Sequence, residues 1–208
     1  MAGTKDGTGA AAERAARVAA MQRAEKARAR RRRVLLVALP SAVVVGIAAT
    51  VVAVIANQPE PPSLAAVTTF QYTGGQHTEE PVQYAENPPV GGEHAPVWLN
   101  CGIYDAPVPN ENAVHSMEHG AVWITYSPDL PAEQVEQLEE AVAQETYTVL
   151  SPYEGLPSPV VLSAWNNQLP VPDADDPRIG AFLAKFVQGA QTPEPGALCS
   201  QGVGTPTG

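Results

Sequence analysis

The sequence predicts an α+β protein, with one small extracytoplasmic domain that has a short-stranded sheet and two helices, preceded by one transmembrane helix. Three observations support this fold class: an uncharged run over residues 34–56, short apolar runs bounded by Pro, Gly or Asn, and two segments with helical apolar spacing. The part beyond residue 70 is long enough for one compact core and too short for two.

The run over residues 34–56 is long enough to cross a hydrocarbon core at about 1.5 Å per residue. The alternative is a cleaved signal peptide, but the apolar part of such a peptide usually has about 7–15 residues, and no A-x-A motif precedes Asn57. Ten Lys/Arg against three Asp/Glu precede the run, giving +7, and two against nineteen follow it, giving −17. The positive-inside rule then predicts a single-pass protein of the cell membrane with a cytoplasmic N-terminus and an extracytoplasmic C-terminal domain.

The chain is therefore divided into a basic cytoplasmic arm (1–33), a transmembrane helix (34–56), a Pro-rich linker (57–69), the α+β domain (70–190) and a tail (191–208). Nucleic-acid binding by the arm is an alternative, but attraction to anionic lipid explains its charge without that partner. No internal repeat is evident.

Two helices are predicted, over residues 129–144 and 176–190. Each has Asp and Pro at its start, which is typical of a helix N-terminus. Apolar residues then recur at helical spacing and predict one buried face, as in Ile179, Phe182, Leu183 and Phe186. Four strands are predicted within APVWLNCGIY, AVWITYS, YTVLS and PVVLSAW, in an antiparallel or mixed sheet.

The two cysteines, Cys101 beside a predicted strand and Cys199 in the tail, are expected to form a disulfide outside the cytoplasm. The bond would tie down a tail of low apolar content. The alternative is a reduced Cys101 that binds a soft metal, which would leave Cys199 without a partner.

The strings GGEHAPVWLNCGIY and HSMEHGAVW, with LSPYEGLPSPVVLSAWNNQLPV and DPRIGAFLAKFV further on, resemble a bacterial, mostly actinobacterial, family of single-pass membrane proteins catalogued as domain of unknown function 3105. The resemblance covers about residues 70–190. It implies a membrane anchor and an exported domain, and it supplies no activity.

All four histidines lie within a 43-residue stretch, and HSMEHG places His115, Met117 and His119 at alternate positions. On an extended segment these three side chains share a face, whereas on a helix only the two histidines do. The prediction is a copper site formed by His115, Met117 and His119, with His94 as the fourth ligand and His77 as a weaker candidate. Imidazole and thioether donors suit copper, and zinc gains less from Met117. Because imidazoles must be neutral to bind, affinity is expected to fall below about pH 6.5.

The function expected from these residues is membrane-anchored metal binding, with copper capture or delivery as its purpose. The alternative is a non-catalytic docking or assembly module for a membrane complex, in which the His/Met cluster is structural. No catalytic activity and no small-molecule substrate are expected. An open zinc site with Glu118 is the catalytic alternative, but the HExxH order is absent and Glu118 would point away from His119 on a strand.

Overall fold

The computed structural model describes residues 6–57, 60, 62–143 and 145–207; within its long helix it does not describe the side chains of residues 6–12, 39, 42 and 43. The chain divides into two compact units, Met1–Glu60 and Pro61–Gly208. We describe each unit by itself.

In the first unit the described residues form one helix, α1 (Asp6–Ala56), with Pro40 inside it. In the part of the chain that the structure describes, no helix is both long enough and apolar enough to cross a membrane. This finding overturns the transmembrane helix predicted over residues 34–56, together with the membrane location and orientation that depended on it. The prediction relied on an absence of charge, but the run is the C-terminal part of a helix that begins within the basic arm, and not a helix of its own.

The second unit has the predicted α+β character, and its described residues form one mixed sheet of six strands in the order β1-β6-β5-β3-β4-β2. The strands are β1 (Thr68–Thr69), β2 (Gly102–Ile103), β3 (Val122–Tyr126), β4 (Thr148–Pro152), β5 (Val160–Ala164) and β6 (Asn167–Val171). The pairs β2–β4 and β3–β4 are parallel, and the other pairs are antiparallel. The prediction included strands close to β2, β3, β4 and β5 but missed β1 and β6.

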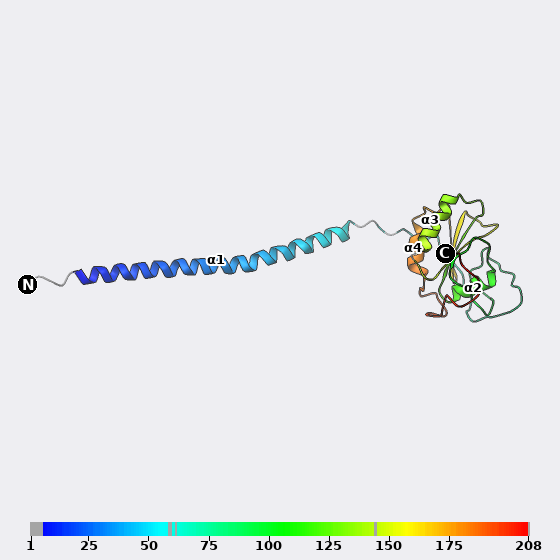
Figure 1. Ribbon diagram of the computed structural model, residues 1–208, viewed down its shortest axis with the longest axis horizontal. Coiled ribbons are helices and arrows are strands. Elements are labelled where there is room, and N and C mark those ends of the chain that lie inside the picture. Colours follow the sequence, from blue (N-terminus) through cyan, green and yellow to red (C-terminus); the bar gives the residue numbers. More distant parts are fainter. Residues whose placement is uncertain (1–5, 58–59, 61, 144, 208) are drawn as a thin grey trace, which may run out of the picture. The chain divides into compact units, whose positions relative to one another are not determined.

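Helices cover both faces of this sheet (Figure 1). On one face α3 (Ala132–Val142) and α4 (Arg178–Phe186) pack against Val122 and Ile124 of β3. On the other face α2 (Asn110–Glu118) packs against Trp123, because successive residues of a strand point to opposite faces. The two predicted helices are confirmed as α3 and α4, and the buried stripe of α4 is the predicted one: Ile179, Phe182, Leu183 and Phe186.

The segment that contains HSMEHG forms α2 and its C-terminal end and is not an extended run, so the predicted common face of His115, Met117 and His119 is wrong. Backbone hydrogen bonds form at the C-terminal end of the helix. Gly120 then ends it, with a φ of +97°. A side chain at position 120 would clash with Gln188 and Thr192. The positive φ is also unfavourable for any residue with a Cβ atom. The turn at Gly120 then sends the chain directly into β3.

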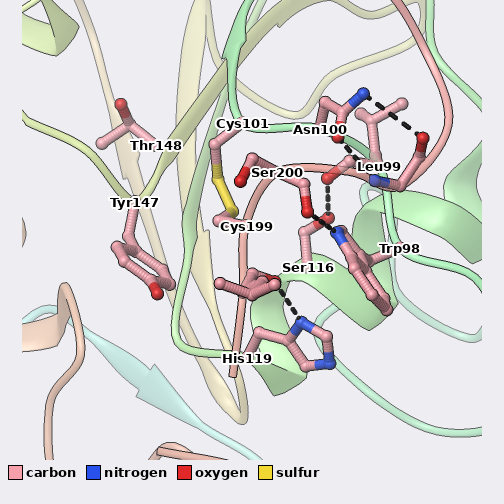
Figure 2. The surroundings of a disulfide bond; sticks show 12 residues. Trp98, Leu99, Asn100, Cys101, Ser116, His119, Tyr147, Thr148, Cys199 and Ser200 are labelled. Atoms are coloured by element: carbon pink, nitrogen blue, oxygen red, sulfur yellow. Dashed lines mark hydrogen bonds between the residues drawn. A yellow bond between two sulfur atoms is a disulfide. The ribbon is translucent and has the colours of Figure 1, made fainter. Parts of the chain in front are cut away.

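The predicted disulfide between Cys101 and Cys199 is confirmed. It fixes the C-terminal segment against the domain, where the backbone N–H of Cys101 donates to the carbonyl of Cys199 at 2.8 Å. Figure 2 shows this segment beside Trp98 and His119, and the indole Nε1 of Trp98 donates to the carbonyl of Ser200 at 3.1 Å. The segment was expected to have little structure of its own, but the disulfide and these bonds hold it beside the end of α2.

Candidate metal centre

The last turn of α2 presents three polar side chains on one side of the helix. His115, Glu118 and His119 are spaced i, i+3 and i+4, which places them next to one another. All three are buried, and Glu118 is 0 % exposed. Met117 lies on another side of the helix, where it packs in the apolar cluster with Trp123 and Trp165.

Two loop segments bring the other histidines to this turn. The backbone N–H of Thr78 donates to the carbonyl of His94 at 2.8 Å, and the N–H of His94 donates to the carbonyl of Gln76 at 3.0 Å. This short bridge places His77 beside His94. The ring of His77 stacks on that of His115 with centroids 4.8 Å apart, so all four histidines of the chain gather at one place.

The donor atoms of His77, His94, His115 and Glu118 all lie within 4.8 Å of one another. An oxygen of the Glu118 carboxylate, Oε2, lies 3.0 Å from Nε2 of His94 and 3.4 Å from Nε2 of His77. The other oxygen accepts a hydrogen bond from the backbone N–H of Gly75. His77 is the exposed member of the group, at 38 %.

Backbone carbonyls fix the tautomers of the three buried histidines. The Nδ1 atom of each ring lies at hydrogen-bond distance from a carbonyl oxygen: 2.7 Å to Gly92 for His94, and 2.6 Å to Ala95 for His115. For His119 the acceptor is Leu198, also at 2.6 Å. A carbonyl can only accept, so each Nδ1 carries the hydrogen and each neutral ring directs an unprotonated Nε2 into the cluster. Metal-binding histidines are oriented in the same way.

This arrangement lacks a positive charge. The Nε2 of His94 faces the Glu118 carboxylate, and the Nε2 atoms of His115 and His119 face each other at 2.9 Å. Neutral rings would bring lone pairs together at both contacts, so each contact requires a cation, which is either a proton or a metal ion. The two basic residues beyond residue 57 do not supply it, because Arg178 pairs with Asp176 and Lys185 lies over the ring of Phe186.

The electrostatics of the site favour ligands in their binding forms. Burial alone raises the pKa of Glu118, but the hydrogen bond from His94 when its Nε2 carries a proton, and the bond from the backbone N–H of Gly75, outweigh it and lower the pKa to about 2. Burial lowers the pKa of His115 to about 4, and the nearby histidines add to the effect, although the bond to Ala95 opposes it. Near neutral pH, Glu118 is therefore an anion and His115 is neutral.

The metal-free protein is expected to lose stability as the pH falls from 6.5 towards 4. His115 has an ordinary pKa of 6.5 in the unfolded chain and about 4 in the folded one, so over this interval the unfolded state binds the extra proton. Thermal unfolding at several pH values in the presence of a chelator measures the loss. The slope should be shallower for His115→Gln, and an equal slope in both proteins would contradict the assignment.

The structure brings together three of the four predicted ligands, His94, His115 and His119, and separates Met117 from them. It adds His77, the weaker candidate of the sequence analysis, and Glu118, which would point away from His119 only on a strand. It also adds Glu194 from the tail, which lies 3.4 Å from Nε2 of His119. Glu118 could have been found from the spacing of His115, Glu118 and His119 once the segment is assigned to a helix; no local signal points to Glu194.

The chain matches the family described as "Protein of unknown function (DUF3105)" over residues 76–201, and it belongs to that family. The matched region contains all four histidines, Glu118, Glu194 and both cysteines. No curated protein and no solved structure matches the chain.

Proposed function

We propose that this member of the family is a metal-binding protein that holds one divalent transition-metal ion between Nε2 of His77, His94 and His115 and the carboxylate of Glu118. The observation that carries the proposal is the direction of the buried rings: carbonyls hold each Nδ1–H, and the free Nε2 atoms converge on an ionised, fully buried carboxylate. A divalent cation supplies the positive charge that these contacts require.

Three imidazoles and one carboxylate suit Cu²⁺ and Zn²⁺. Copper remains the first candidate because affinity for nitrogen and oxygen sites rises to Cu²⁺ in the divalent series and is lower for Zn²⁺. The argument for Cu⁺ is weaker than the sequence indicated, because the thioether of Met117 lies in the apolar core. Titration with each ion against a chelator of known affinity separates the candidates.

The proposed role is capture or delivery of the ion rather than catalysis. Four protein donors are the number found in closed structural sites, whereas catalytic sites have three and keep one position for a reacting water. The alternative role as a docking module required an exposed aromatic surface. Among the aromatic residues that would form such a surface, Trp98 and Tyr153 are partly buried, and the other four are buried: Tyr104, Trp123, Tyr126 and Trp165. Their burial favours the metal-binding role.

Replacement of His77 by Ala is expected to weaken metal binding by about tenfold or more without unfolding the domain. His77 is the exposed ligand, so its loss removes a donor but leaves the core unchanged. Equilibrium titration with Zn²⁺ and with Cu²⁺ against a competing chelator measures the effect on the full chain, and circular dichroism monitors the fold.

The matched control is Met117→Leu, a replacement of similar volume in the apolar core that should leave affinity unchanged. If wild type binds neither ion, the proposed function is wrong and the cluster is structural. If Met117→Leu lowers affinity as much as His77→Ala does, the donor set is wrong.

A further inference from the structure

A second set of donors overlaps the first. His115, His119 and Glu194 also have their donor atoms within 4.8 Å of one another. The Nε2 of His119 lies 2.9 Å from that of His115 and 3.4 Å from the Glu194 carboxylate. Two imidazoles and a carboxylate form a ligand set for the same class of divalent ion, with a fourth position left open.

The protein positions this second set through the C-terminal segment. The backbone N–H of Glu194 donates to the carbonyl of Glu118 at 3.1 Å, which places Glu194 directly beside the end of α2. Gln188 adds two bonds to the same turn, one from its backbone N–H to Gly120 at 2.9 Å and one from its side chain to the carbonyl of His119. The carbonyl of Leu198, the residue before Cys199 of the disulfide, accepts the Nδ1–H of His119.

The two sets share one atom that can bind only one ion. Nδ1 of His115 is occupied by its hydrogen bond to Ala95, so only Nε2 is free to bind. An ion on His115 is therefore completed either by His77, His94 and Glu118 or by His119 and Glu194. Each position has one exposed donor, His77 at 38 % in the first set and Glu194 at 47 % in the second, but the first set also depends on Glu118 and His94, which are 0 % exposed.

We propose that His115, His119 and Glu194 form an exchange site, through which the ion enters and leaves the four-donor site. This inference rests on the proposed metal binding and extends it. During release the ion keeps His115, loses His77, His94 and Glu118, and gains His119 and Glu194. The open fourth position then accepts a ligand from an acceptor molecule, and no change of oxidation state is involved. His115 remains bound to the ion throughout the transfer.

The test is the rate at which Zn²⁺ passes from the loaded full chain to an excess of a chromophoric chelator, followed by stopped-flow absorbance. Wild type should bind one Zn²⁺ per chain. His119→Ala and Glu194→Gln should each slow the transfer by about tenfold or more, while equilibrium affinity changes by less than about threefold, within the ordinary context dependence of a single contact. Glu154→Gln removes an equal charge from an exposed residue and should transfer at the wild-type rate.

The outcomes separate this inference from the function on which it rests. If wild type binds no Zn²⁺ or Cu²⁺, the metal-binding proposal itself fails. If wild type binds one Zn²⁺ tightly but both variants release it at the wild-type rate, the exchange site is wrong and the four-donor site stands. Two ions per wild-type chain would show that the sets do not share His115. A large loss of affinity in both variants would show that His119 and Glu194 belong to the main site.

Discussion

Loss of the disulfide between Cys101 and Cys199 is expected to lower the free energy of unfolding by about 2–5 kcal/mol. The bond joins residues 98 positions apart and so closes most of the domain into a loop. On the chain-entropy model a loop of about 100 residues gives about 4.7 kcal/mol, the upper part of that range. Chemical denaturation of the Cys101→Ser, Cys199→Ser double variant measures the change against the oxidised wild type.

Reduced wild type is the control for this prediction, because it loses the same bond without a change of sequence. Both proteins should also lose protection from hydrogen exchange at the amide of Cys101, which donates to the carbonyl of Cys199. An oxidised wild type no more stable than the reduced protein would contradict the expected contribution. Since Leu198 and Glu194 lie in the segment that the bond retains, reduction should also disturb the contacts of His119.

The parts of the fold that the sequence predicted well are those with strong local signals. In α4 the spacing of Ile179, Phe182, Leu183 and Phe186 repeats one helical face, and all four are buried. In β3 the apolar run is bounded by Gly120 and by Ser127-Pro128, and its five residues are all buried. Such patterns determine an element without reference to the rest of the chain.

The helix α2 was missed because an alternating pattern and a helical one coincide at HSMEHG. His115 and His119 are spaced i, i+4, which suits a helical face as well as a strand, and the neighbouring apolar run favoured the strand. The stronger signals lay at the ends: Pro109 before Asn110 and Glu111, and Gly120 after the last turn. These signals predict a short helix, and with it a Glu118 directed towards the histidines.

The strand β6 and the position of Glu194 could not be predicted from the residues that neighbour them in the sequence. Pro170 lies within β6, and a proline weakens the prediction of a strand. The β5–β6 hairpin is formed by the two-residue turn at Trp165-Asn166, where Asn166 has a φ of +63°. Glu194 reaches His119 only because the disulfide and the hydrogen bonds of Gln188 place the C-terminal segment against α2. No periodicity in that segment indicates its position.

Replacement of Glu118 by Gln is expected to abolish measurable metal binding, with a loss of affinity of about 100-fold or more, and to destabilise the metal-free domain by about 1–3 kcal/mol. Gln has nearly the same shape, so the change removes the charge and one acceptor without opening a cavity. The buried carboxylate lies beside His94 and His77 and accepts from Gly75; an amide can replace these contacts but has no negative charge to attract a metal ion or a protonated imidazole. Calorimetric titration with Zn²⁺ and thermal unfolding measure the two effects.

The pH dependence of stability shows whether Glu118 acts through its charge or through the shape of its side chain. Because the folded-state pKa of Glu118 is lowered from 4.5 to about 2, its carboxylate contributes stability above pH 4.5 that is lost as the pH falls towards 2. The stability difference between wild type and Glu118→Gln should therefore be full near neutral pH and become smaller over that interval. Glu140→Gln, the same change on an exposed face of α3, should affect neither binding nor stability. A difference that stays constant with pH, together with normal Zn²⁺ binding by Glu118→Gln, would show that the carboxylate charge is not what holds the histidine cluster together.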